Sequence, residues 1–516
     1  MRRRTTRLLV ATVLIAVAPA LVGAAPAAAQ RPGTATAPPV TWSDCDDGYQ
    51  CATVAAPLDY DQPRGRQISL SLIKDPATDP ANRIGTLFVN FGGPGASGVE
   101  RLRARGRWEW LFSPELRARF DLVSWDTRGV GRSSAVRCFG TEAEQQEFFS
   151  TIPAFPVGAS EERAFYAAAE DLGRRCRDRN GDLLDHLSSA DTARDLDLLR
   201  RAVGDSHLNY FGLSYGTYVG ATYANLFPDR VRALVLDGAL DFIGNATGHG
   251  INGLTKPIDT RQDVPRGIAE TFDQFLRRCA AAGAAKCAFA AGGDPRTKFA
   301  ELTARARQRP VVVDGESWSY TSIISTVNDN LPRPLWWADL AVQLERLYNA
   351  PQTATLGARA ARPTPGEEYL ANNTEAFYAT NCADSIVPGN TAIYSRLGAS
   401  EERRVPYFGP IGVFDYMPCA KWPARNTDRY LGPWDRWTAA PILVVNNRYD
   451  PSTPWHGARD ATAELARGRL FTIEGAGHTG MFVPSTCGER VKREYLFTGA
   501  LPAPGVVCAA DDDPFA

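Results

Sequence analysis

The stretch Gly212-Leu213-Ser214-Tyr215-Gly216 decides the fold because of what lies on either side of it. Before it, Leu208-Asn209-Tyr210-Phe211 has the composition of a short buried strand. After it, residues 217–227 form a run rich in small and apolar side chains that ends at a proline. A strand, a tight glycine-flanked turn and a helix together raise a serine hydroxyl above the end of a sheet. Small residues recur one helical turn apart after the serine, at Gly216, Gly220 and Ala224. The pattern therefore predicts a nucleophilic serine on a helix that packs closely on its strands.

Further strands are expected on both sides of this turn. Residues 68–72 alternate with period two, as a half-exposed strand does. The other strand-like runs are mostly apolar, that at residues 85–90 continuously so, and the rest span residues 120–125, 231–236, 442–446 and 468–473. Continuous runs of this kind are typical of strands buried on both faces of a parallel sheet, and helical patterns such as residues 188–203 lie between them. The sequence predicts an α/β fold with a mostly parallel central sheet flanked by helices.

The strand pattern stops after residue 240 and resumes near residue 442, and the intervening segment has mainly helical patterns. We interpret this segment as a large, mainly helical cap inserted into the fold, since 516 residues exceed one simple core. The predicted boundaries are a signal peptide (1–29), a linker or short pro-segment (30–40), the first part of the core (41–240), the cap (241–430) and the second part of the core (431–516).

The N-terminus has the three parts of an export signal. Arginines cluster before an apolar run at residues 8–22, and Ala27-Ala28-Ala29 provides a small-residue cleavage site. The apolar run is short and interrupted by Pro19, which argues against stable membrane insertion. The protein is therefore expected to be secreted after cleavage near Ala29. A net charge of −1 gives no reason to expect nucleic-acid binding, and the sequence does not fix the oligomeric state.

The chain has ten cysteines, and an even number in an exported protein predicts disulfides. Short loops close at the smallest entropic cost, so sequential pairing is favoured. The expected pairs are Cys45 with Cys51, Cys138 with Cys176, Cys279 with Cys287, Cys382 with Cys419, and Cys487 with Cys508. Because the cysteines form no CxxC motif and only five histidines are present, neither a metal site nor a cofactor is expected.

A serine nucleophile needs a base, and the base needs an acid that orients it. In an α/β fold of this kind both follow the serine in the chain, first the acid and then the histidine. His478 lies in a glycine-rich loop directly after the last predicted strand, and Asp450 lies in the turn after the strand at 442–446. The sequence predicts Ser214, Asp450 and His478 as the catalytic triad, with Asp237 at another strand end as the competing acid.

The tetrahedral intermediate of such a reaction needs main-chain N–H donors for its oxyanion. The residue after the nucleophile, Tyr215, is one expected donor. The second is expected from Phe91-Gly92-Gly93-Pro94-Gly95, which follows the strand at 85–90, and Gly93 is the candidate. Glycine at this position would let the main chain approach the oxyanion closely.

Taken together, these motifs resemble a known family. Gly92-Gly93-Pro94-Gly95, Asp126-Thr127-Arg128-Gly129-Val130-Gly131-Arg132-Ser133, the serine turn and Gly475-Ala476-Gly477-His478-Thr479-Gly480 are similar to the prolyl-aminopeptidase branch of the α/β-hydrolases. Within it, the chain most resembles the secreted tripeptidyl aminopeptidases of actinobacteria, over roughly residues 40–510. Phe91 departs from the pattern, because the branch commonly has histidine there.

The resemblance implies an α/β-hydrolase fold and release of short peptides such as tripeptides from free N-termini through an acyl-enzyme. It also implies that Asp126, Arg128 and Gly131 brace loops near the oxyanion hole. A site closed around a substrate ammonium needs carboxylates.

In the cap, the candidates for binding that ammonium are Glu375 and Asp384, in a segment that Cys382 would anchor. Trp336 and Trp337 are candidates for the wall of the acyl pocket. The alternative is that both are aromatic residues buried in the core. The alternative function is a carboxylesterase on the same scaffold. Because both activities use the same core motifs, carboxylates presented by the cap to the pocket would separate them.

Overall fold

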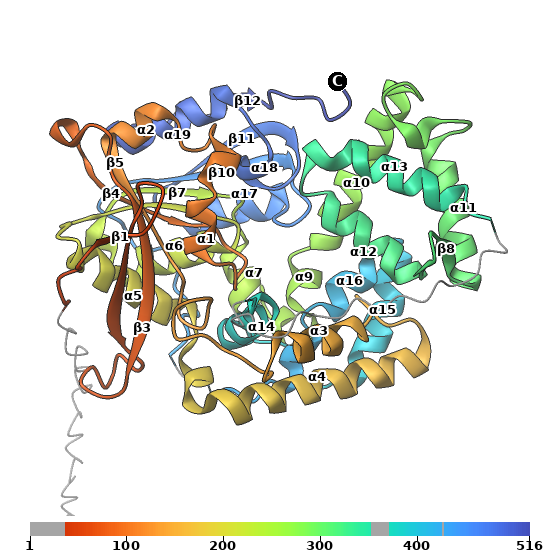
Figure 1. Cartoon of the computed structure of the whole chain (residues 1–516), viewed down its shortest axis with the longest axis horizontal. Helices are drawn as coiled ribbons and strands as arrows, with labels where there is room; N and C mark the ends of the chain where they lie inside the picture. The colour runs from red at the N-terminus through yellow and green to blue at the C-terminus, as the bar shows by residue number, and fades with distance from the viewer. Residues whose placement is uncertain (1–36, 352–370, 426–427) are drawn as a thin grey trace, which may run out of the picture.

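The computed structural model describes residues 37–351, 371–425 and 428–516. The predicted signal peptide and most of the predicted linker lie outside the described residues. Figure 1 shows two parts side by side: a twisted sheet with its helices, and a group of helices that continues to one side of it.

One ten-stranded sheet forms the core, in the order β1-β2-β3-β5-β4-β6-β7-β10-β11-β12. The first three strands run antiparallel up to the β3–β5 pair, and every pair from β5 through β4 to β12 is parallel. The carboxyl ends of these parallel strands therefore meet at one edge. The strands are β1 (Ser43–Asp44), β2 (Gln50–Pro57), β3 (Gln67–Asp75), β4 (Gly85–Asn90), β5 (Phe120–Trp125), β6 (Leu208–Leu213), β7 (Val231–Asp237), β10 (Ile442–Tyr449), β11 (Gly468–Ala476) and β12 (Val507–Ala509).

Helices cover both faces of the sheet, which explains why the central strands are apolar throughout. Every residue of β6 is buried, and so is nearly all of β4 and β7. The helices on one face are α5 (Ser189–Ala202), α6 (Tyr215–Leu226) and α17 (Trp455–Glu464). Those on the other face are α1 (Gly98–Arg103), α2 (Pro114–Arg119), α18 (Thr479–Phe482) and α19 (Thr486–Thr498). This arrangement confirms the predicted α/β fold class.

The segment between β7 and β10 forms a mainly helical cap with its own apolar core. Its helices are α7 (Phe242–Ala246), α8 (Asn252–Thr255), α9 (Ile258–Arg261), α10 (Val264–Ala282), α11 (Pro295–Gln308), α12 (Tyr320–Asn330), α13 (Trp337–Tyr348), α14 (Asn373–Asp384), α15 (Ala392–Arg404) and α16 (Gly409–Phe414). A two-stranded hairpin, β8 (Val311–Val313) with β9 (Glu316–Trp318), is also present. The sequence patterns did not predict this hairpin, because its strands have only three residues each.

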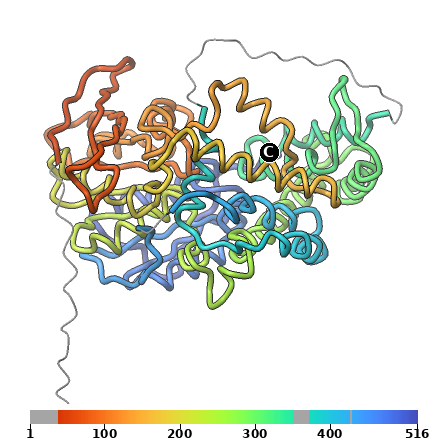
Figure 2. The backbone as a smooth tube through the Cα atoms, turned by 90° about the horizontal axis from the view of Figure 1, so that it is seen from below, coloured from red at the N-terminus to blue at the C-terminus, as the bar shows by residue number. Residues whose placement is uncertain are grey.

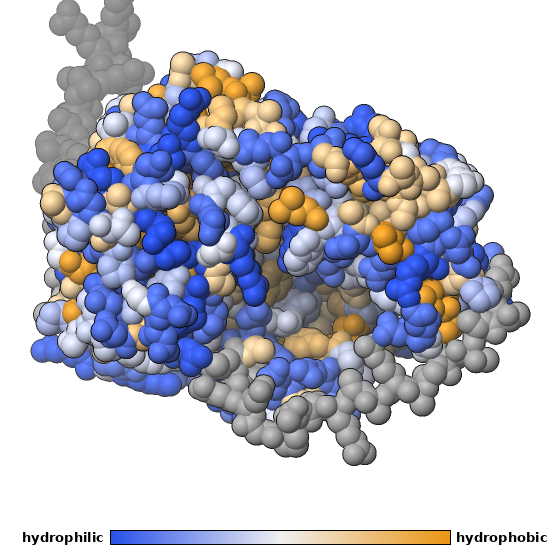
Figure 3. Space-filling model, turned by 45° about the horizontal axis from the view of Figure 1, so that its top comes forward, coloured by the Kyte–Doolittle hydropathy of each residue, from blue (hydrophilic) through white to orange (hydrophobic). Residues whose placement is uncertain are grey.

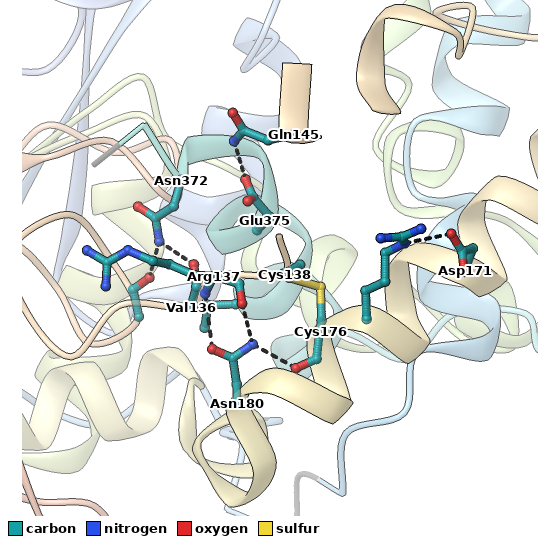
Figure 4. The surroundings of a disulfide bond; sticks show 11 residues. Val136, Arg137, Cys138, Gln145, Asp171, Cys176, Asn180, Asn372 and Glu375 are labelled. Atoms are coloured by element: carbon teal, nitrogen blue, oxygen red, sulfur yellow. Dashed lines mark hydrogen bonds and ion pairs between the residues drawn. A yellow bond between two sulfur atoms is a disulfide. The ribbon is translucent and has the colours of Figure 1, made fainter. Parts of the chain in front are cut away.

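A second excursion from the core, between β5 and α5, contains α3 (Glu142–Ser150) and the long α4 (Gly158–Asn180). Figure 1 shows α4 along the lower edge of the molecule, and Figure 2 shows from below that it crosses from the sheet toward the cap. The disulfide between Cys138 and Cys176 ties this helix to the loop after β5 (Figure 4).

All ten cysteines form disulfides in sequential order, the pairing that short loop closure favours. One of them, Cys382–Cys419, joins the end of α14 to the segment after α16 inside the cap. Such a set of disulfides is typical of proteins folded in an oxidising compartment. None of the described helices combines the length and the apolar character that a membrane span requires.

Candidate active site

A cavity of about 420 Å³ lies where the carboxyl ends of the strands face the cap. Figure 3 shows the surface hollowed between these two parts of the molecule. Ser214, Gly93 and His478 line the cavity from the sheet side, and helices α9, α12 and α16 or their ends line it from the cap side. Residues from distant parts of the sequence therefore line one cavity.

Ser214 sits in a strained turn between β6 and α6. Its φ and ψ are 55° and −127°, a conformation that side chains other than glycine rarely adopt. The Ser214 N–H donates to the main-chain oxygen of Asp237 at 2.8 Å, which ties the turn to the end of β7. A Cβ on Gly212 or Gly216 would lie 2.4 or 2.6 Å from main-chain oxygens, so both flanking glycines are required by close packing.

His478 follows β11, and a carboxylate holds its ring. The Nδ1 atom of His478 lies 2.9 Å from each carboxylate oxygen of Asp450, which follows β10. The Asp450 carboxylate also accepts the N–H groups of Ser452, Thr453 and Thr479 at 2.9–3.2 Å. Because these donors fix the carboxylate, the carboxylate in turn fixes the ring through its Nδ1 atom.

The cap also holds the histidine loop. The His478 N–H donates to the main-chain oxygen of Pro332 at 2.9 Å, in the segment after α12. The Gly477 N–H donates to Tyr449 at the same distance, and Gly477 has a φ of 128° with no room for a Cβ. The histidine is therefore positioned from both the sheet and the cap.

The Gly92–Gly95 loop lies directly against the serine turn. A Cβ on Gly92 would stand 2.4 Å from the main-chain oxygen of Leu213 and 3.0 Å from the Tyr215 nitrogen, so only glycine fits there. Gly93 lines the cavity together with Ser214 and Tyr215, and its role as the second oxyanion donor stays a prediction. Phe91, in the place of the usual histidine, packs its ring against Trp108 and Phe112.

Buried polar groups brace the loops behind this site. Asp126 accepts hydrogen bonds from the Ser97 hydroxyl at 2.6 Å and the Val99 N–H at 3.1 Å, at the start of α1. Arg128 forms a bidentate ion pair with Asp195, at 2.6 and 2.8 Å, with both side chains fully buried. A Cβ on Gly131 would collide with Asp126. These contacts place Asp126, Arg128 and Gly131 in bracing positions.

Asp237, the competing acid, does not contact the histidine ring. Its carboxylate accepts from Lys492 Nζ at 2.9 Å and from the Gly480 N–H at 3.1 Å. Lys492 also pairs with Glu489, and all three side chains are almost completely buried. Asp237 therefore anchors the segment after His478 through the hydrogen bond that it accepts from the Gly480 N–H.

Asp384 is close to the site but lies behind it, outside the cavity lining. Its carboxylate accepts from the Tyr215 hydroxyl and, at 2.7 Å, from the Ser189 N–H. Burial raises the pKa of Asp384 to about 7. Both oxygens are thus occupied by hydrogen bonds that join α14 of the cap to α5 and α6 of the core. The predicted contact between Asp384 and a substrate ammonium is not formed by this geometry.

Glu375 is also placed away from the cavity. It is fully buried, and its carboxylate accepts a hydrogen bond from Gln145 of α3 at 2.7 Å (Figure 4). Burial raises the pKa of Glu375 to about 7. This corrects the expected ammonium contact, because α3 covers the side chain.

Neither tryptophan lines the cavity. Trp337 is buried in the cap core against Phe275, whereas Trp336 is half exposed under the Arg333 guanidinium. The predicted acyl-pocket role is therefore corrected for both residues.

Four cap carboxylates that the sequence reasoning missed line the cavity. One is Asp241, which accepts the Gly244 N–H at the start of α7, and three others come from helices farther along the chain. They are Asp259 in α9, Asp329 in α12 and Asp415 at the end of α16. Burial, and then the charge of Asp329, raises the pKa of Asp415 to about 6. Burial and the charge of Asp415 raise the pKa of Asp259 well above its usual value. Repulsion among neighbouring carboxylates is relieved when a cation binds between them.

Two groups of carboxylates and a histidine lie close enough together to share a cation. They are Asp241, His249 and Glu464, and Asp59, His186 and Asp428. In the first group, hydrogen bonds already occupy the carboxylates. Asp241 accepts the Gly244 N–H, and Glu464 accepts N–H groups at the start of α7. In the second, Asp59 already accepts from Asp61 and Gln62. We assign no metal to either group.

The fold and the serine turn define a serine hydrolase of the α/β-hydrolase class, and comparison with known proteins agrees. Residues 86–289 match the alpha/beta hydrolase fold family, and residues 405–508 match the TAP-like protein family. The chain is 31% identical over 490 residues to a tripeptidyl aminopeptidase of Streptomyces coelicolor, covering 92% of this chain and 87% of that one.

It is also 31% identical over 508 residues to the serine protease Hip1 of Mycobacterium tuberculosis, covering 91% of each. A carboxylesterase B of the same organism is 31% identical over 523 residues, covering 95% of each. The chain belongs to the family of α/β-hydrolases that contains these three proteins.

Proposed function

We propose that this protein is a secreted serine exopeptidase that releases short peptides, including tripeptides, from free N-termini. In this proposal Ser214 attacks the scissile carbonyl, His478 takes the hydroxyl proton and returns it to the leaving amine, and Asp450 orients His478. The N–H groups of Tyr215 and Gly93 hold the oxyanion. Water then hydrolyses the ester bond to Ser214, which frees the serine hydroxyl and releases the short peptide with a C-terminal carboxylate.

The observation that carries the proposal is the set of cap carboxylates in the same cavity as Ser214 and His478. Asp259, Asp329 and Asp415 give that cavity an acidic wall for a substrate ammonium, whereas a neutral acyl chain would gain nothing from it. The names of two relatives, a tripeptidyl aminopeptidase and a serine protease, support a peptide substrate. The export signal in the sequence and the five disulfides support secretion.

Asp415→Asn is expected to lower kcat/KM for tripeptide substrates with a free N-terminus by about 10- to 100-fold, because hydrogen bonds to charged groups contribute that much. The same substrates carrying an N-acetyl group are expected to change little. Fluorogenic tripeptide amides with free and acetylated N-termini measure both effects. The matched control is Asp339→Asn, which removes an exposed carboxylate from α13. Equal turnover of free and acetylated peptides by the unmodified enzyme would favour the carboxylesterase alternative.

Acid is expected to remove the preference for a free N-terminus. The pKa of Asp415 is raised to about 6, so this carboxyl is mostly ionised at pH 7 and mostly protonated at pH 5. The substrate ammonium stays protonated over this range. The ratio of kcat/KM for free over acetylated peptides should therefore fall by up to about tenfold from pH 7 to pH 5. Taking the ratio cancels any pH effect that the two substrates share, and a ratio independent of pH would contradict the assignment.

A further inference from the structure

Two arginines line the same cavity, and the charge of Asp329 acts on one of them, Arg333, without an ion pair between the two side chains. Arg101, in α1, and Arg333, after α12, form no ion pair within the part of the chain that the structure describes. The Nη1 atom of Arg101 donates to the sulfur of Met481 at 3.7 Å. Arg333 donates to the main-chain oxygen of Asp329 at 2.6 Å, and its guanidinium lies over the ring of Phe482 at 5.2 Å from the centroid.

This arrangement is unfavourable in the absence of an anion. Burial lowers the pKa of Arg101, and the charge of Arg333 lowers it further, so two like charges face the same partly buried space. A desolvated cation is costly unless it is paired, and a guanidinium pairs best with a carboxylate, whose two oxygens match its donors. The two side chains are therefore arranged to receive a carboxylate from outside the protein.

The arginines lie on the side of the cavity where the leaving group must be. Both contact α18, through Met481 and Phe482, and this helix begins directly after His478. Because the histidine returns its proton to the leaving amine, that amine must lie next to His478. A carboxylate bound by Arg101 and Arg333 therefore belongs to the departing part of the substrate.

The cavity wall carries charges of both signs. Asp259, Asp329 and Asp415 line it from the cap, and Arg101 and Arg333 line it beside α18. A short peptide that carries both an ammonium and a carboxylate offers one group to each set of side chains.

We propose that Arg101 and Arg333 bind a carboxylate of the leaving group, and that the substrates are short peptides with a negative charge close behind the cleaved bond. This inference rests on the proposed exopeptidase function and adds the chemistry of the departing side. The charge is either the C-terminal carboxylate of the peptide or an acidic side chain.

The test compares peptides that differ only behind the cleaved bond. The tripeptide that the fluorogenic assay turns over fastest is extended by alanine with a free C-terminus, by alanine amide, or by aspartic acid amide. Initial rates are followed by liquid chromatography and mass spectrometry. We expect the free-acid peptide to exceed the alanine amide in kcat/KM by about 10- to 100-fold. A gain restricted to the aspartic acid amide would show that the two arginines bind an acidic side chain of the leaving group. Equal rates for all three peptides would overturn the proposal.

Variants link the preference to the two residues. Arg101→Gln and Arg333→Gln are expected to lower kcat/KM for the free-acid peptide to the value for the alanine amide. The rate for a tripeptide aminomethylcoumarin amide, which has a neutral leaving group, should stay the same. Arg101→Lys should retain part of the preference because it keeps the charge. Arg107→Gln, an exposed arginine outside the cavity, is the control. A preference that survives in the double glutamine variant would contradict the proposal. Since N-acetylation is tested separately, loss of this site leaves the proposed function standing.

Discussion

Ser214→Ala is expected to lower kcat by about 10⁶-fold, because a serine nucleophile and its base act as a unit and removal of either abolishes the acyl-enzyme route. The fold should survive, since alanine is smaller and the strained turn is held by the Ser214 N–H and the flanking glycines, which the substitution leaves in place. Thermal unfolding and fluorogenic turnover measure the two properties separately.

A fluorophosphonate probe gives an independent readout for the same residue. It should add its mass to the peptide that contains Ser214 in the unmodified enzyme and to no peptide in the Ser214→Ala variant. Ser206→Ala, at an exposed serine just before β6, is the matched control and should retain full activity. Residual turnover of more than a few per cent in Ser214→Ala, with labelling at another serine, would mean that the nucleophile is elsewhere.

Asp450→Asn is expected to lower kcat by about 10⁴-fold with the site geometry intact. An asparagine amide facing His478 Nδ1 would donate a proton where the carboxylate accepts one, so the ring would take the tautomer that carries its proton on Nε2. That tautomer cannot accept the proton of Ser214. The measurement is kcat at neutral pH, together with thermal unfolding to show that the variant is folded.

Asp237→Asn separates the two acids that the sequence left in competition. Asp237 binds Lys492 and the Gly480 N–H, with no contact to the histidine ring, so this change leaves a buried ammonium less well paired. We expect a lower melting temperature and a much smaller loss of kcat than in Asp450→Asn. The opposite order of the two losses would make Asp237 the orienting acid.

The parts of the site that can be read from sequence lie on local motifs at strand ends. Ser214, Asp450 and His478 each follow a strand of recognisable composition, and parallel strands bring their carboxyl ends to one edge. Glycines at Gly92 and Gly216 point to close main-chain packing, which the structure contains. The local sequence pattern and the sheet topology together are enough to predict the positions of these residues.

The cap residues depend on packing that no local pattern encodes. Asp259, Asp329 and Asp415 come from three helices far apart in the sequence, and each alone resembles an ordinary helical aspartate. Glu375 and Asp384 looked equally suitable, because sequence does not reveal that Gln145 and Tyr215 occupy their carboxylates. The segment that contains them was singled out from the sequence, but the contacts of its carboxylates are set by α3, α5 and α6.

The hydrogen bonds of Asp384 and Pro332 set a rule for re-engineering specificity. Asp384 belongs to the cap yet holds the tyrosine that follows the nucleophile, and Pro332 belongs to the cap yet holds the histidine main chain. A chimaera that receives a whole foreign cap would lose both supports unless the donor carries equivalents. Libraries aimed at new peptide preferences should therefore keep these two positions fixed and vary the cavity-facing residues of α9, α12 and α16, where recognition can change without disturbing the chemistry.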